Sequence, residues 1–283
     1  CGAAYRLGLT GKGIGVAVLD TGIFLHRDFD SRVTGFADMV NGKNFAYDDC
    51  GHGTHICGII GGSGRMSGGR YSGIAPGCDL VMVKVLDRKG NGYSSDVLAG
   101  ISWILERKEK LGIRILNISV GACSKRGMSE NSALVKGVNR AWDAGLVVVV
   151  AAGNNGPRTM SITTPGISRK VITVGCSDDD REVLVGGNRM VDYSGRGPTA
   201  ACICKPDLVA PGCSVVSCSS RADKYTIKSG TSMSTPIVSG AVALLLERFP
   251  DMTNKDVKLR LRESSVDIGL PRNQQGWGLL DVG

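Results

Sequence analysis

Short apolar runs of strand length alternate with helical patterns along this chain of 283 residues. The strand candidates are residues 15–19, 80–86, 114–118, 146–151 and 171–175. None of these runs alternates with polar residues, which is typical of strands buried on both faces of a parallel sheet. Parallel neighbours need crossover connections, usually helices, which then cover the sheet. The pattern predicts an α/β fold, a three-layer, doubly wound, mostly parallel sheet with helices on both faces.

Helical spacing separates the apolar runs. Residues 94–111 carry the stripe of an amphipathic helix, and residues 129–145 repeat it up to Gly145, a plausible C-terminal glycine. Further helices are expected after Ser232 and from Thr253. No internal repeat and no linker interrupts this order. We therefore expect a single domain over residues 1–283.

The charge of the chain is positive but dispersed. Lys and Arg number 34 against 26 Asp and Glu, and only residues 107–110 and 258–262 form local clusters. Both clusters lie in helical patterns, which favours solvated helix faces over a nucleic-acid surface and leaves modest steering of acidic substrates open. No apolar stretch reaches the 18 residues of a membrane span. We expect no nucleic-acid partner and no membrane span.

Ten cysteines are unusual for a chain large enough to fold without disulfides. Several stand where a small apolar residue would serve, Cys57 and Cys176 among them. We interpret most of them as reduced thiols, which favours a reducing, cytoplasmic compartment over secretion. Cys202 and Cys204 are too close for a zinc knuckle and lack a second pair at metal spacing, so no metal site is expected there.

Three separated segments each hold one residue suited to nucleophilic hydrolysis. Asp20 ends an apolar run, His52 opens a small-residue helix, and Ser232 precedes a long apolar helix. Asp20 would fix the tautomer of a histidine, which would accept the proton of the serine. A serine at a helix N-terminus would also gain oxyanion stabilisation from the helix dipole and its own N–H.

Each residue alone has an ordinary structural interpretation. Asp20 followed by Thr21 and Gly22 is a common turn, and an aspartic protease would need a second such motif, which the chain lacks. His55 shares a helix face with His52 and is the competing base. Ser232 would also serve as an ordinary N-cap, with Pro236 in the first turn of its helix.

Taken together, residues from about 11 to 283 resemble the subtilisin (subtilase) family of serine endopeptidases. The chain order Asp, His, Ser is that of subtilisin. The segment Gly51-His52-Gly53-Thr54-His55 resembles the family's histidine motif, which implies that His52 is the base. Asn154 resembles the family's oxyanion-hole asparagine, although its surroundings also suit a turn. The sequences of residues 194–199 and 205–207 resemble the variants seen in bacterial intracellular-type subtilases.

The resemblance also implies a substrate channel. In the family, an extended substrate pairs with two edges of the protein. In this chain one edge would follow the expected strand at 80–86 and the other the expected strand at 114–118. The wall and base of the pocket for the residue before the cut would come from the end of the expected strand at 146–151 and the residues after it. These positions are Gly90, Asn91, Gly92, Ser119, Val120 and Gly121 for the edges, and Ala151, Ala152, Gly153 and Thr163 for the pocket. Two edges hold an extended peptide through main-chain hydrogen bonds. None of these residues is charged, which favours a neutral, apolar side chain before the cut.

The calcium chemistry of the family is the main departure. The region matching its tight calcium loop, residues 61–71, has no Asp, Asn or Glu, although Asp28 aligns with one carboxylate ligand. Hard cations need several oxygen ligands, carboxylates among them. We expect this calcium site to be degraded and assign no metal residues and no cofactor.

The expected function is endoproteolysis of proteins or peptides through an acyl-enzyme. Two alternatives stay open, a maturation protease with one client and a peptide-binding pseudoenzyme. The chain begins at Cys1 and not Met, which suggests a processed form with an upstream propeptide as a possible partner.

Overall fold

A seven-stranded, wholly parallel sheet lies at the centre of the structure, a computed structural model that describes residues 2–121 and 129–281. Its strand order is β2-β3-β1-β4-β5-β6-β9. The strands span Gly15–Asp20 (β1), Val33–Asp38 (β2), Asp79–Lys84 (β3), Ile113–Ile118 (β4), Val147–Ala151 (β5), Ile172–Cys176 (β6) and Leu208–Ala210 (β9). This confirms the predicted mostly parallel α/β fold.

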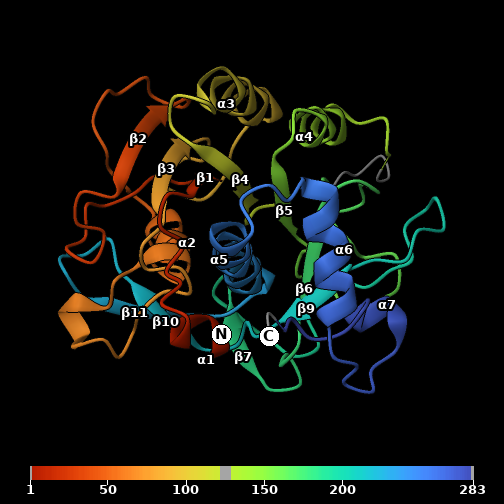
Figure 1. Ribbon diagram of the computed structural model, residues 1–283. Helices are drawn as coiled ribbons and strands as arrows, with labels where there is room; N and C mark the ends of the chain where they lie inside the picture. Colours follow the sequence, from red (N-terminus) through yellow and green to blue (C-terminus); the bar gives the residue numbers. More distant parts are fainter. Residues whose placement is uncertain (1, 122–128, 282–283) are drawn as a thin grey trace.

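Helices cover both faces of the sheet (Figure 1). They span Gly2–Arg6 (α1), His52–Gly61 (α2), Ser94–Arg107 (α3), Ala133–Asp143 (α4), Thr231–Arg248 (α5), Asn254–Ser264 (α6) and Arg272–Gln275 (α7), with a 3-10 turn at Arg65–Ser67. Helices α3 and α4 pack together on one face, and α2 packs against α5 on the other. The result is the predicted three-layer arrangement.

Two small antiparallel hairpins flank the sheet. One pairs β7 (Val183–Val185) with β8 (Asn188–Met190), and the other pairs β10 (Val215–Cys218) with β11 (Tyr225–Lys228). The sequence did not predict either hairpin, nor β2 and β9. The strand β2 is only half-buried and β9 has three residues, so neither presents the long apolar run that marked the other strands.

Helix α5 runs through the middle of the molecule and is buried on nearly all sides. Its contacts reach β4, β5, β6 and β9 as well as α2. A helix that is apolar all round requires such complete burial, and it then holds a fixed position in the core. The first turn of α5, at the carboxyl edge of the sheet, is therefore held firmly in place.

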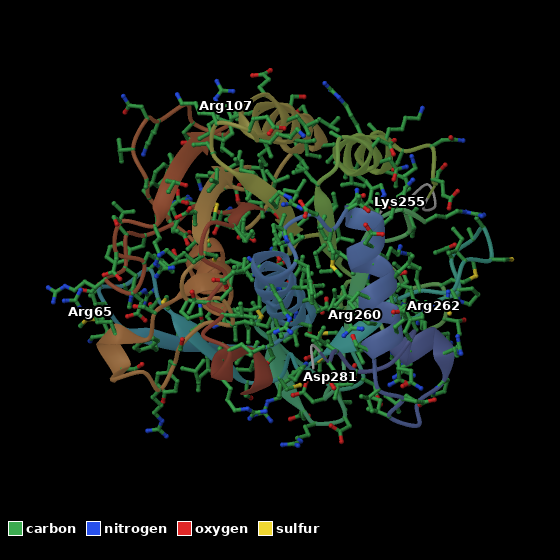
Figure 2. All side chains as sticks on the ribbon, in the orientation of Figure 1. Arg65, Arg107, Lys255, Arg260, Arg262 and Asp281 are labelled. Atoms are coloured by element: carbon green, nitrogen blue, oxygen red, sulfur yellow. The ribbon has the colours of Figure 1, made fainter. Side chains whose placement is uncertain are left out.

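The basic side chains are spread over the surface. Figure 2 shows Arg65 at the start of the 3-10 turn and Arg107 on α3, on different sides of the molecule, with Lys255, Arg260 and Arg262 along α6. This agrees with the dispersed charge expected from the sequence. In the ranges that the structure describes, no helix combines the length and apolar character needed to cross a bilayer.

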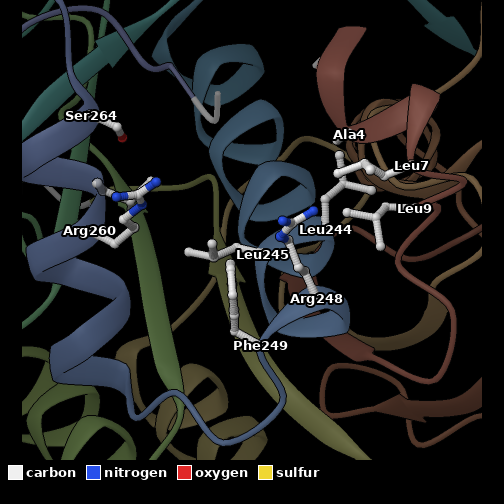
Figure 3. A pocket seen from close by; sticks show the side chains of 10 residues that line it. Ala4, Leu7, Leu9, Leu244, Leu245, Arg248, Phe249, Arg260 and Ser264 are labelled. Atoms are coloured by element: carbon white, nitrogen blue, oxygen red, sulfur yellow. The ribbon is translucent and has the colours of Figure 1, made fainter.

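A hollow of about 290 Å³ lies at the far end of α5 (Figure 3). Leu244, Leu245, Arg248 and Phe249 line it from the last turns of that helix, opposite Leu7 and Leu9. Ser232 occupies the first turn of the same helix. At 1.5 Å per residue, the length of α5 separates this hollow from the residues predicted to carry chemistry.

Candidate active site

Asp20 lies at the carboxyl end of the central strand β1, fully buried. The neighbouring strand pairs Lys84 with it, and the ammonium of Lys84 donates to the carbonyls of Thr21 (2.6 Å) and Leu86 (2.8 Å). Lys84 also bonds Asp49 at 2.7 Å. A buried ammonium with three oxygen partners satisfies its hydrogen bonds and fixes the turn that follows Asp20.

His52 is the first residue of α2, and its ring faces Asp20. The Nδ1 atom lies 2.8 Å and 2.9 Å from the two carboxylate oxygens of Asp20. Burial, the largest influence, lowers the pKa of His52, but the charge and hydrogen bond of Asp20 outweigh it, so the pKa lies above its ordinary value. The carboxylate thus stabilises the imidazolium and fixes Nδ1 as the donor, which leaves Nε2 as the acceptor.

Asp48 joins the turn after Asp20 to the start of α2, a contact that sequence reasoning missed. Its Oδ1 accepts hydrogen bonds from the Thr21 hydroxyl (2.9 Å) and the Gly51 N–H (2.7 Å). Its Oδ2 accepts from the N–H (2.9 Å) and hydroxyl (2.6 Å) of Thr54. A carboxylate at a helix N-terminus satisfies N–H groups that lack intrahelical partners. Asp48 therefore sets the position of the helix that carries His52.

The two segments also touch directly. The Thr21 hydroxyl accepts the N–H of Gly53 at 2.9 Å. A Cβ on Gly53 would lie 2.2 Å from the carbonyl oxygen of Gly22, so only glycine permits this approach of helix to turn. The glycine after His52 is thus a packing requirement of the His52–Asp20 contact.

His55 is fully buried and turns away from Asp20. Its Nε2 lies 3.1 Å and 3.2 Å from the carbonyls of Val215 and Thr226 in the β10–β11 hairpin. Burial lowers the pKa of His55 to about 3, so the ring is neutral and Nε2 is the donor. Its place and bonds are those of a structural histidine that ties α2 to the hairpin.

Ser232 lies inside the first turn of α5, not at its cap. The N-cap is Gly230, and Pro236 stands in the second turn rather than the first, so the N-cap alternative for Ser232 was wrong. The Ser232 hydroxyl donates to the carbonyl of Ser119 at 2.7 Å. Because the first-turn N–H groups of a helix have no acceptor within it, the N–H of Ser232 is suited to bind an oxyanion.

Asn154 is oriented by the residue before Ser232. Its Oδ1 accepts both the N–H and the hydroxyl of Thr231, each at 3.0 Å. The amide oxygen is thereby occupied at the base of α5, and the Nδ2 donor group is left for another acceptor. This is the orientation that an oxyanion donor needs.

A cleft of about 470 Å³ contains most of the residues predicted for the site. Those that line it are His52, Gly90, Ser119, Val120, Gly121, Ala151, Gly153, Asn154, Thr163 and Ser232. Asp20 lies behind His52, and Ala152 is buried and does not line the cleft. Ala152 contributes through its carbonyl, which accepts the N–H of Thr163 at 2.9 Å.

Thr163 fills the space between Gly121 of one predicted edge and Gly153 of the predicted pocket. A Cβ on Gly121 would lie 2.2 Å from its Oγ1, and a Cβ on Gly153 would lie 2.4 Å from its Cγ2. Both glycines are therefore needed where Thr163 reaches the surface of the pocket. The small residues and the threonine together define a neutral recess beside Ser232.

Two basic residues also line the cleft, and the sequence analysis did not include them. Lys89 lies on the loop after β3, and Lys228 ends β11. The charge of Lys228 lowers the pKa of His52, although by less than Asp20 raises it. The predicted channel residues are uncharged, but Lys228, from a hairpin that the sequence did not predict, adds positive charge to the cleft.

An adjoining apolar hollow of about 230 Å³ holds the remaining predicted positions. Asn91 and Gly92 line it, beside Tyr93, Leu134 and Val138. Gly90, Val120 and Gly121 line both hollows. Residues of both predicted edges thus line both hollows.

Asp28, aligned with a calcium ligand, is fully buried and hydrogen-bonded within the protein. Its Oδ2 accepts the Tyr225 hydroxyl at 2.6 Å, and its Oδ1 accepts the N–H of Met66 at 2.9 Å. Met66 belongs to the loop 61–71 that lacks acidic residues. Protein donors therefore occupy both oxygens of this carboxylate.

Comparisons with known proteins place the sequence in one family. The sequence model of the subtilase family matches residues 11–278. The chain belongs to the subtilase family. The matched region includes Asp20, His52 and Ser232.

Named relatives and a solved structure support the same assignment. Serine protease AprX of Bacillus subtilis is 43% identical over 274 residues, which cover 91% of this chain and 62% of AprX. A thermostable alkaline protease of Halalkalibacterium halodurans is 35% identical, covering 99% of this subtilase and 69% of the relative. The structure of Sphericase superposes with a TM-score of 0.83 at 31% identity, covering 97% and 93% of the two chains.

The contact between Thr21, Asp48 and Gly53 gives a first prediction. Thr21→Val keeps the shape of the side chain but leaves the buried N–H of Gly53 without an acceptor, which costs about 1–3 kcal/mol of stability. Displacement of His52 should lower kcat by about 10- to 100-fold. Thr21→Ser retains the hydroxyl and is the matched control. Equal kcat for the valine and serine variants would contradict a positioning role.

Proposed function

We propose that this subtilase is a serine endopeptidase whose nucleophile is Ser232. The observation that supports this most directly is the pairing of His52 with a buried Asp20 in the cleft that also contains Ser232 and Asn154. His52 would accept the Ser232 proton through Nε2 as the hydroxyl attacks a peptide carbonyl. The Ser232 hydroxyl would first turn from the Ser119 carbonyl to His52, as catalytic hydrogen bonds commonly tighten when substrate binds.

Two N–H donors would stabilise the tetrahedral oxyanion. One is the N–H of Ser232 in the first turn of α5, and the other is the Nδ2 group of Asn154. Such donors are effective because they are fixed before the charge develops. The imidazolium then protonates the leaving amine, and water hydrolyses the acyl-enzyme through the same residues.

The substrate would be an extended segment of protein or peptide. We propose that it lies between the edges at residues 90–92 and 119–121, with a neutral side chain in the recess of Ala151, Gly153 and Thr163. The apolar hollow beside Tyr93 and Leu134 would accept a second apolar side chain. Lys89 and Lys228 would favour acidic residues elsewhere in the segment.

The other two functions receive less support. A peptide-binding pseudoenzyme has no need for the Asp20–His52 contact or for the orientation of Asn154. A maturation protease with one client would use the same residues, so the sequences of cleaved peptides from a library would distinguish it from a broad endopeptidase. An upstream propeptide as a partner stays a prediction.

The nucleophile gives the second prediction. Ser232→Ala should lower kcat by about 10⁶-fold, because serine proteases lose nearly all turnover without this hydroxyl. The melting temperature should stay within a few degrees, since one half-buried hydroxyl is removed. Ser234→Ala is the control: its buried hydroxyl has no partner among the described residues, and activity should persist. Near-normal hydrolysis by the Ser232 variant would refute the assignment.

The raised pKa of His52 gives the third prediction. The base must be neutral, so kcat/KM of the free enzyme should fall as pH decreases through a midpoint above 6.5, the ordinary value for histidine. Lys228→Gln removes a charge that lowers this pKa, so its midpoint should move to higher pH. A downward shift in this variant, measured in the pH profile, would contradict the proposed electrostatics.

We also propose that the region around Asp28 is stable without calcium, because Tyr225 and Met66 already bond its carboxylate. If calcium did bind there, calcium at 100 times its Kd would stabilise the folded protein by about 2.7 kcal/mol. Because we expect no such binding, adding calcium to metal-free protein should leave the melting temperature unchanged. A rise of several degrees that Asp28→Asn abolishes would show that calcium binds there.

A further inference from the structure

Sulfur and oxygen donors from two separate segments meet at the carboxyl ends of β6 and β9. Cys176 ends β6, Asp178 follows two residues later, and Cys213 follows β9. The two Sγ atoms and one carboxylate oxygen all lie within 4.8 Å of one another. Their sequence spacing matches no metal motif, so only the fold brings them together.

These donors are hydrogen-bonded through protons that a cation could replace. The Cys176 thiol donates to Asp178 Oδ1 at 3.1 Å, and the Tyr193 hydroxyl oxygen lies 3.2 Å from each Sγ. Asp178 Oδ1 also accepts the N–H groups of Gly212 (2.7 Å) and Cys213 (3.1 Å). The backbone therefore fixes the carboxylate through its Oδ1 atom.

The buried hydroxyl of Ser234 points to the same place. It has no hydrogen-bond partner among the residues that the structure describes. A Cβ on Gly212 would lie 2.4 Å from Ser234 Oγ and 2.8 Å from Cys176 Sγ, so both atoms face Gly212. An unsatisfied buried hydroxyl is costly, and it indicates a polar site that is incomplete without a further group.

We propose that Cys176, Cys213 and Asp178 bind a thiophilic divalent cation of the zinc class. Two thiolates and a carboxylate are ligands that zinc accepts, whereas calcium and magnesium require oxygen alone. Binding would release the two thiol protons to solvent, one from each cysteine. Tyr193 is next to the fourth position. Cys213 and Asp178 are half-buried and give the cation a route from solvent to the buried Cys176.

The site adjoins the backbone that carries the nucleophile. The carbonyl of Gly212 accepts the N–H of Gly230 at 3.0 Å, and Gly230 is the N-cap of α5. The cation would thus lie beside the segment that holds Ser232 without contacting Ser232 or His52. Its binding does not depend on the proposed peptidase activity and can be measured in Ser232→Ala protein.

Cadmium is the probe of choice, because thiolate-to-cadmium charge transfer gives an ultraviolet band that carboxylate and imidazole sites do not. Reduced, metal-free Ser232→Ala protein should give a band that saturates at one equivalent and that zinc displaces. When Cys213→Ser or Cys176→Ala is combined with Ser232→Ala, cadmium binding should weaken by at least about 100-fold. Loss of a residue that only contacts a metal ligand usually costs less than this. Adding Cys50→Ser, or Cys202→Ser with Cys204→Ser, should leave the band unchanged.

Three results would overturn the proposal. One is the absence of a saturable band, and another is a band that persists in folded Cys213→Ser protein, whose half-buried substitution should not disturb the core. The third is a disulfide between Cys176 and Cys213 in peptide maps of protein prepared under reducing conditions, since those sulfurs would then hold no cation. Circular dichroism confirms folding of each variant before titration.

Discussion

The carboxylate of Asp48 joins two chain segments whose side chains have to meet. Five hydrogen bonds to its two oxygens link the turn after Asp20 to the first turn of α2. Apart from that link, α2 is joined to the segment after Asp20 by packing and by the Gly53–Thr21 and Phe24–Thr54 hydrogen bonds. The short His52–Asp20 distances follow from this arrangement, and the raised pKa of His52 follows from those distances.

Helix α5 supplies the other half of the site by a different means. Its burial between the sheet and α2 fixes the helix as a whole. The first turn then presents Ser232, and Thr231 orients Asn154 through the amide oxygen. Position is thus set by apolar packing for the nucleophile and by a hydrogen-bonded carboxylate for the base. The cleft lies where these two differently held elements face each other.

Much of the fold could be predicted from sequence because buried parallel strands carry an unmistakable apolar pattern. The runs at β1, β3, β4, β5 and β6 were each located to within two residues. Short or half-buried elements such as β2, β9 and the hairpins lack that pattern. Because the β10–β11 hairpin was not predicted, the position of Lys228 in the cleft was not predicted either. Asp48 could not be recognised either, since an aspartate in a polar loop has no local feature that reveals its five hydrogen bonds to four residues. Cys176 was interpreted as a small apolar residue and Cys213 was not considered individually, although the fold places them together.

The central claim is that Ser232 is the nucleophile activated by the His52–Asp20 pair. Intact-mass spectrometry after reaction with a fluorophosphonate, followed by peptide mapping, tests it most directly. The account predicts one adduct per molecule, located on Ser232, formed at a rate that falls as His52 becomes protonated. An adduct on another residue, or no adduct in folded protein, would contradict it.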